Sequence, residues 1–494
     1  FFEWKTAEQE TELTQLWEIT NGLLTAGFDV EQNWISKTFN IPIGGKKKIQ
    51  QPTPNVAASY LPENKPRYEF TCSCGNHVQA VGKPSQDKIN QFSEDLAKYI
   101  FDGEDTLGIE GGLIAEESNL LIDALRGNFK IFNSYVGPDH LALQMMEYNL
   151  FEFSASKTES RLAAMKELLI DYDKKELRDF NSFKTECEKI TKDFNTKWLQ
   201  AEYNLSVAVG QTSAQYIQFY AEKDSVTAFV EYQTVGDDKV RESHQILDGK
   251  IFSLNDKEAM KLWPPNGYGC RCEMLQYLGE TKGKLTDGLR GQELLQSRDP
   301  KYKNSQFTSI FTTSCSGFEI NRGDIKAVFT DKQFYSDNKG LPEKLNQMTY
   351  DKYGLKSWSD LKKDLKPIKL DKTITKENVQ ELFKGNISAK KMGFEDYLGR
   401  KLVLNKTAFN RHAKRPELFP HVADILKDPS EVWLSSHNTK GLQTNYIKHY
   451  KDMSVMISTS INEEMQGMEI ETWFDIDYSK PLERRKGLLI KKGD

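Results

Sequence analysis

The sequence is most informative at residues 263–272, which read Trp-Pro-Pro-Asn-Gly-Tyr-Gly-Cys-Arg-Cys. Prolines and glycines at this density predict an irregular turn. Within it, Cys270 and Cys272 can present two thiolates to one cation. Upstream, His244 and Asp248 can add a nitrogen and an oxygen ligand, and zinc is the ion that this mixture favours. Alternatively, buried small polar residues hold a long loop together by hydrogen bonds, and the thiols are packing atoms.

Length and composition limit the possible classes of protein. The chain has 494 residues, with 67 Lys and Arg against 72 Asp and Glu, so its net charge is −5. This length favours three or four domains, and the balanced charge excludes a protein that coats nucleic acid along its whole surface. Six cysteines are too few for a disulfide scaffold and favour synthesis in a reducing compartment. The sequence contains no run of 18 apolar residues, so it predicts no membrane span.

Upstream of the turn, the sequence predicts mainly helix. Apolar residues that recur every three or four positions place one stripe on a long helix: Phe183, Cys187, Ile190, Phe194 and Trp198. We expect two short helices in residues 1–43, a linker with a Cys-x-Cys turn in residues 44–84, and a helical region in residues 85–226. The first residue is Phe1 rather than Met, which predicts that the chain is the downstream part of a longer product.

The pattern changes after Thr227. Residues 228–235 predict a strand, which begins a loop-rich α+β module over residues 227–280. Residues 281–375 predict a linker or mixed region. A helix at residues 416–426 and a run of strand candidates then predict an α+β domain with an antiparallel sheet over residues 376–494. The strand candidates are residues 431–435, 442–450, 453–461, 468–476 and 488–492. The predicted fold class is therefore multi-domain, mainly helical in its N-terminal and middle regions.

The last domain has the composition of a polyanion-binding surface. Residues 384–415 hold nine Lys and Arg against two acidic residues, a local charge of +7. Alternation along the next strand places Tyr446, Lys448 and Tyr450 on one face, where rings can stack on bases and the ammonium can meet phosphate. Cleavage of RNA without a metal needs a base, an acid and cations. The residue types that can serve are His412, His421, Lys448, His449 and Arg485. The alternative is an exposed basic surface without catalysis.

The middle of the chain closely resembles the Mu-F-type head morphogenesis proteins, which are minor head proteins of tailed phages. The motifs that carry the resemblance are Asp238, Val240-Arg241, Ser243-His244, Leu247-Asp248-Gly249, Pro264-Pro265 and Cys270-Arg271-Cys272. With helical segments upstream, the resemblance spans about residues 138–275. It implies a protein of the virion that is made in the host cytoplasm and binds portal and capsid proteins, and that contacts packaged DNA. Many relatives carry a His where this chain has residues 266–268, Asn-Gly-Tyr, which weakens the zinc prediction.

Both ends of the chain show further resemblances. Residues 1–43 resemble the C-terminal end of a Mu-type portal protein. Residues 390–490 resemble the phage-associated barnase/EndoU/colicin/RelE-like nuclease domains, which act as toxins. The second resemblance implies RNA as substrate, an immunity protein as partner and a metal-independent ribonuclease activity. The candidate catalytic residues are His412 as general base, Lys448 as phosphate-binding cation, Thr472 as positioning hydroxyl and Tyr446 beside them.

Three functions are consistent with these patterns. The first is a phage minor head protein that carries a C-terminal ribonuclease effector domain. The second is a purely structural head-completion protein, whose last domain is inactive and docks on the capsid or tail. The third is a polymorphic toxin that uses a Mu-F module for delivery.

Overall fold

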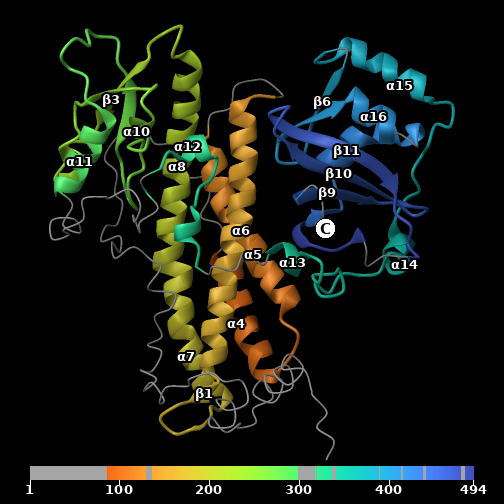
Figure 1. Cartoon of the computed structure of the whole chain (residues 1–494). Coiled ribbons are helices and arrows are strands. Elements are labelled where there is room, and N and C mark those ends of the chain that lie inside the picture. The colour runs from red at the N-terminus through yellow and green to blue at the C-terminus, as the bar shows by residue number, and fades with distance from the viewer. Residues whose placement is uncertain are drawn as a thin grey trace, which may run out of the picture. The chain divides into compact units, whose positions relative to one another are not determined.

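The computed structural model describes most of the chain from residue 86 onward (Figure 1). The described residues are 86–129, 136–298, 318, 320–335, 341–388, 390–412, 415–437, 441–479 and 484–493. The expectations for residues 1–43 and 44–84 lie outside these residues. No helix in the described part of the chain is both long and apolar enough to cross a membrane.

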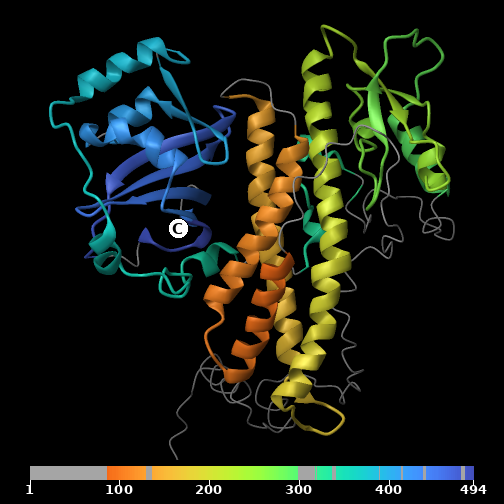
Figure 2. The ribbon, with the colours of Figure 1, turned by 180° about the vertical axis from the view of Figure 1, so that it is seen from behind.

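The region from residue 86 to residue 222 is helical, as predicted. Its long helices are α4 (Gln86–Asp102), α5 (Leu107–Asn128), α6 (Pro138–Glu167), α7 (Phe180–Asp193) and α8 (Leu199–Glu222). Helix α5 packs against both α6 and α8, and the two views of the ribbon show these helices side by side (Figures 1 and 2). A short hairpin of β1 (Ile170–Asp171) and β2 (Glu176–Leu177) connects α6 to α7.

The predicted apolar stripe lies on α7 and on the π-helical turn that follows it. One π-helical turn, Phe194–Trp198, joins α7 to α8, so the backbone runs on without a loop. Phe183, Cys187 and Phe194 are buried, and the other two stripe residues are half-buried. The stripe is therefore core, because its side chains pack into the bundle rather than face a ligand.

The middle module is built on a small antiparallel sheet. Its strand order is β4 (Ile251–Ser253), β3 (Phe229–Gln233), β5 (Glu273–Gln276). Three helices accompany the sheet: α9 (Glu242–Gln245), α10 (Lys257–Met260) and α11 (Gly288–Arg298). Trp263 anchors the module to the helical region, because its Nε1 donates to the Thr212 carbonyl of α8 at 2.9 Å and its ring meets Tyr216 edge to face.

The C-terminal domain contains a seven-stranded sheet, which confirms the predicted α+β class. Its strand order is β12 (Leu488–Lys492), β8 (Glu431–His437), β9 (Gly441–His449), β10 (Ser454–Asn462), β11 (Gly467–Asp475), β7 (Lys401–Asn405), β6 (Lys391–Glu395). All neighbours pair antiparallel except β7 and β11, which are parallel. The helices in the described part of this domain are α15 (Lys376–Leu382), α16 (Lys406–His412) and α17 (Val422–Lys427), with 3-10 helices at Phe383–Gly385 and Pro416–His421.

Strand register assigns the side chains of this sheet to two faces. Val432, Tyr446, Ile457 and Trp473 are paired across four strands and therefore share one face. Phe409 of α16 stacks on Trp473, so α16 covers that face.

The opposite face carries a separate apolar cluster. It contains Trp433, Ile447 and Met456, against which Tyr350, Tyr353 and Leu355 pack. These three residues precede the predicted C-terminal domain in sequence, between α13 (Leu341–Leu345) and α14 (Trp358–Leu361). Their segment is bonded to the sheet, since Tyr350 N–H donates to the Arg485 carbonyl at 2.9 Å. The segment therefore forms part of the covering of this sheet.

Candidate metal centre and candidate nuclease site

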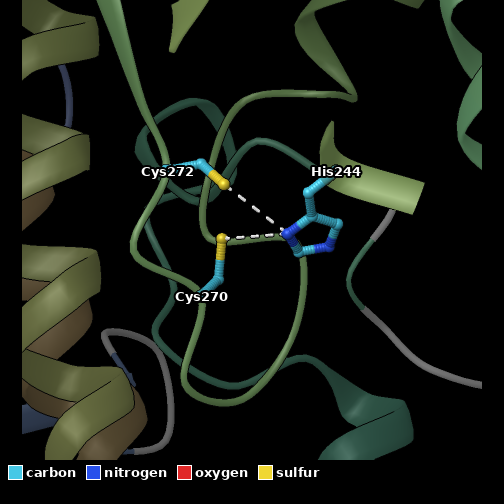
Figure 3. Close-up of side chains that lie close together, drawn as sticks. All are labelled: His244, Cys270 and Cys272. Atoms are coloured by element: carbon cyan, nitrogen blue, oxygen red, sulfur yellow. Dashed lines mark hydrogen bonds between the residues drawn. The ribbon is translucent and has the colours of Figure 1, made fainter. Parts of the chain in front are cut away.

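His244, Cys270 and Cys272 converge on one point of the middle module (Figure 3). The Nδ1 atom of His244 lies 3.7 Å from Cys270 Sγ and 3.5 Å from Cys272 Sγ. All three side chains are buried. The ring comes from the short helix α9, and both thiols come from the loop that leads into β5, so three of the four predicted ligands lie together.

The Pro/Gly-rich turn is bonded to the residue that precedes α9. The Pro264–Pro265 peptide bond is cis, and Gly269 has a φ of +70°, a conformation that an L side chain disfavours. Arg241, the residue before α9, donates from Nη2 to the Tyr268 carbonyl at 2.5 Å. The turn is thereby tied to the helix that carries His244.

Asp248, the fourth predicted ligand, lies elsewhere. Its Oδ1 accepts hydrogen bonds from Thr234 N–H at 2.7 Å and from the Thr234 hydroxyl at 2.8 Å. Among the described residues, the convergent group contains His244, Cys270 and Cys272 and does not include Asp248. The structure thus gives Asp248 a role in holding the loop, as in the hydrogen-bonding alternative.

The two sulfur atoms differ in electrostatic environment. A hydrogen bond from Cys272, together with the nearby His244 ring, lowers the pKa of Cys270 well below its usual value despite burial. The contact with Cys270, followed by burial, raises the pKa of Cys272. Burial and both cysteines also raise the pKa of Tyr232, whose hydroxyl accepts from Asn266 Nδ2 at 3.1 Å. Cys270 is therefore the more acidic of the two thiols.

The spacing of the three groups fits a tetrahedral metal ion. With Zn–S near 2.3 Å and Zn–N near 2.0 Å, a thiolate and an imidazole on one ion stand about 3.5 Å apart. The observed nitrogen–sulfur distances of 3.5 and 3.7 Å agree with this value. These three side chains can therefore hold a metal ion.

The predicted catalytic residues of the C-terminal domain are spread over the sheet and one helix. Tyr446 is fully buried, and its hydroxyl donates to Asp396 Oδ2 at 2.8 Å. Lys448 is half-buried at the end of β9, with Nζ 2.6 Å from the Asp428 carbonyl. Thr472 is half-buried on β11, opposite Ser458. His412 is the last residue of α16, and its side chain lies outside those described.

Two buried ionic clusters in this domain contain residues that the sequence did not suggest, and the second cluster also joins His449 and Arg485, which the sequence did suggest. In one, Arg400 contacts Asp396 and Tyr446, and also Glu147 of helix α6. In the other, Arg485 and His449 both contact Glu431. The sequence contained a local signal for the first cluster. Asp396 and Arg400 lie on either side of a Gly-containing turn, and this pattern is typical of a hairpin that its own side chains close.

Comparisons with known proteins agree with the Mu-F-type and the nuclease-type resemblances. Residues 178–275 match the family described as Phage Mu protein F like protein. Residues 378–491 match the family described as phage-Barnase-EndoU-ColicinE5/D-RelE like nuclease2. The Mu-like prophage FluMu F protein of Haemophilus influenzae is 32% identical over 98 residues, which cover 19% of this chain and 23% of that protein. No solved structure matched the chain. The predicted combination of a Mu-F-type region with a C-terminal nuclease-like domain is confirmed.

Proposed function

We propose that this chain is a phage minor head protein that binds portal and capsid proteins and carries an RNA-cleaving C-terminal domain. One observation carries the proposal: a Mu F-like region and a phage nuclease-like region match the same chain, at residues 178–275 and 378–491. The helical region and middle module serve assembly in the virion, after synthesis in the host cytoplasm. They contact the portal, the capsid and packaged DNA. An immunity protein restrains the C-terminal domain in the producing cell.

RNA cleavage needs no metal in this proposal. The RNA 2′-oxygen forms a bond to phosphorus while the P–O5′ bond breaks. A general base takes the 2′-hydroxyl proton, and an acid protonates the leaving 5′-oxygen. His412 acts as base, Lys448 as a cation for the phosphate, and Tyr446, on the same face of β9 as Lys448, positions the substrate. Thr472 is next to Trp473 and therefore lies on the opposite face of the sheet, so it is left out of the proposed site. Lys448 lies near the end of β9 with a side chain that is 26% exposed, and its Nζ pairs with the exposed Asp428 carboxylate at 2.5 Å, a contact that a phosphate group can replace.

The catalytic proposal is tested by incubating the full chain with total RNA. We expect cleavage that His412→Ala and Lys448→Ala each reduce at least tenfold, whereas Glu463→Gln, in an exposed turn, leaves it unchanged. Absence of cleavage in every variant, and also in full-chain Glu147→Gln, which disturbs the contact of helix α6 with the C-terminal domain, favours the purely structural head-completion protein. Cleavage that both substitutions leave unchanged rejects these residues and keeps the activity.

Particle composition tests the assembly proposal. Mass spectrometry of purified phage particles should find this chain at low copy, and crosslinking should join it to the portal or capsid protein. Recovery of the chain only from secreted or cytosolic fractions favours the polymorphic toxin that borrowed a Mu-F module.

We further propose that His244, Cys270 and Cys272 bind zinc, which supplies a fixed link between α9 and the Pro/Gly-rich turn. The convergence of one imidazole and two thiols, at distances that fit one ion, supports this assignment. Elemental analysis of the full chain should give about one zinc per chain. Cys270→Ser should remove it, while Cys187→Ser, at a buried cysteine of α7, should retain it. Metal-free wild-type protein at micromolar free zinc would contradict the proposal.

A further inference from the structure

Helix α6 contacts the C-terminal domain through bonds between residues far apart in sequence. The Gly137 N–H, at the start of α6, donates to the Gln466 carbonyl at 2.9 Å. Further along the helix, the Tyr148 hydroxyl lies 3.1 Å from Thr444 Oγ1 of β9. These contacts bring α6 against the face of the sheet that carries Tyr446, because Thr444 and Tyr446 are two residues apart on β9 and therefore point to the same face.

A guanidinium lies at the centre of this contact. Arg400 follows Gly399 in the hairpin between β6 and β7 and is only 4% exposed. Its Nε donates to Asp396 Oδ2 at 2.6 Å, and its Nη2 lies 3.4 Å from the Tyr446 hydroxyl. These bonds are internal to the domain and fix the orientation of the guanidinium. The Nη1 edge points away from them, toward α6.

The group that meets this edge is a carboxylate from the helix. Glu147 Oε2 lies 3.1 Å from Arg400 Nη1, and the Glu147 side chain is 1% exposed. Its other oxygen accepts from Arg126 Nη1 of α5 at 2.7 Å. Glu147 is therefore an anion between two guanidinium groups, one from the helical region and one from the C-terminal domain.

Stabilisation of the fold alone does not explain why a buried Glu147–Arg400 ion pair joins the two regions. A buried ion pair loses about as much in desolvation as it gains in attraction, so well-packed apolar residues would hold the two regions together equally well. The internal partners of Arg400 already hold it in place without Glu147. A guanidinium recognises a carboxylate and a phosphate in the same planar, hydrogen-bonded way. The carboxylate thus occupies a position that suits a phosphate group.

We propose that Arg400 is the phosphodiester-binding group of the C-terminal domain and that Glu147 occupies its place, so that helix α6 shields the domain from RNA. The inference rests on the proposed RNA-directed function of this domain. Separation of α6, or a change that moves Glu147, exposes the Nη1 edge of Arg400 to the RNA backbone. The helical region then acts as an inhibitor built into the same chain.

Binding of a 2′-O-methyl RNA oligonucleotide tests the inference, because this probe presents phosphodiesters but no 2′-hydroxyl for attack. Fluorescence anisotropy should show that full-chain Glu147→Gln binds it at least tenfold more tightly than wild type. Adding Arg400→Gln to Glu147→Gln should return the affinity to the wild-type level. Glu167→Gln, at an exposed position on the same helix, should change nothing.

Arg126→Gln is the control that distinguishes exposure of Arg400 from a general weakening of the contact between the helical region and the C-terminal domain. It removes one bond within the helical region, to Glu147, and one bond across the interface, to the Leu398 carbonyl, and it leaves the Glu147–Arg400 pair. We expect little gain in binding from this variant, with thermal unfolding curves showing that every variant is folded. Equal affinity of Glu147→Gln and wild type, or a gain that persists without Arg400, overturns the inference.

Cleavage assays with unmodified RNA distinguish the proposed ribonuclease activity from the proposed shielding by α6. Tighter binding by Glu147→Gln without cleavage rejects the ribonuclease activity and leaves the inference intact. Cleavage by wild type at the same rate as by Glu147→Gln rejects the shielding by α6 and leaves the ribonuclease activity intact.

Discussion

Arg485 donates from Nε to Oε2 of Glu431 at 2.9 Å, and both side chains are buried on one face of the C-terminal sheet. His449 adds a contact of 3.2 Å from Nε2 to the other carboxylate oxygen. Its Nδ1 lies 2.7 Å from Ser454 Oγ. Arg485 also donates from Nη1 to the Lys356 carbonyl, so the cluster ties β8 to the segment that covers this face.

The first prediction is that this cluster makes the domain sensitive to acid. Burial alone would raise the pKa of Glu431, but the bonds and charges of His449 and Arg485 outweigh it and lower the pKa to about 2. A lowered folded-state pKa stabilises the protein above the unfolded value of 4.5, and the stabilisation is lost as the pH falls toward 2. The difference corresponds to about 3 kcal/mol.

Denaturant unfolding of wild type and Glu431→Gln at pH 7, 4 and 3 measures this effect. The variant should be less stable at pH 7, and the difference should shrink as the pH falls. Glu463→Gln, at an exposed turn, provides the control for loss of one carboxylate. A difference that is constant with pH would contradict the assignment.

The second prediction concerns Asp248, which the sequence suggested as a metal ligand. Because its carboxylate is bonded to Thr234, Asp248→Asn should leave the zinc content unchanged. It should lower the unfolding free energy by about 1–3 kcal/mol, since a charged acceptor of two hydrogen bonds is lost. Elemental analysis and denaturant unfolding on the same preparations test both parts. If Asp248→Asn loses both its zinc and its stability, Asp248 is a metal ligand after all.

Periodic and local patterns were sufficient to predict much of the fold. The apolar repeats predicted the helical region, and alternation predicted strands close to β8, β9, β10 and β11. Strands β6 and β7 were missed, because Lys391–Glu395 and Lys401–Asn405 are short and begin with lysine. Cys270, Cys272 and His244 could be predicted as one group because they lie within one local module.

Contacts between distant segments were not predictable from these patterns. Glu147 lies within a helix and Arg400 lies in a hairpin turn, and no spacing rule relates them. The same holds for residues 350–355, which read as linker but pack on the sheet. Burial of Tyr446 also depends on tertiary packing, since alternation specifies which residues share a face but not what covers them.

The third prediction concerns the joint between the middle module and the helical region. Trp263 is 1% exposed and combines a hydrogen bond to the Thr212 carbonyl with ring contacts to Tyr216 and Phe219. Trp263→Ala should therefore lower the unfolding free energy by about 3–5 kcal/mol. Leu278→Ala, at a side chain that is 76% exposed, should have almost no effect. Similar unfolding curves for both variants would show that this joint contributes little to stability.

The fourth prediction concerns Gly487, which precedes β12. Its φ is +122°, and a Cβ atom added there would lie 2.1 Å from the Leu434 carbonyl oxygen of β8. Neither that backbone nor Gly487 itself can move without breaking the pairing of β12 with β8. Gly487→Ala should therefore lower the unfolding free energy by about 2–4 kcal/mol, through strain and lost strand pairing.

Gly127→Ala provides the matched control. Gly127 lies in helix α5, and an added Cβ would meet no atom within 4 Å. The same chemical change should stabilise the protein by up to about 1 kcal/mol there, because alanine favours helix over glycine. Opposite signs for the two substitutions in thermal unfolding would show that the close approach at Leu434, rather than the added methyl group itself, limits residue 487 to glycine.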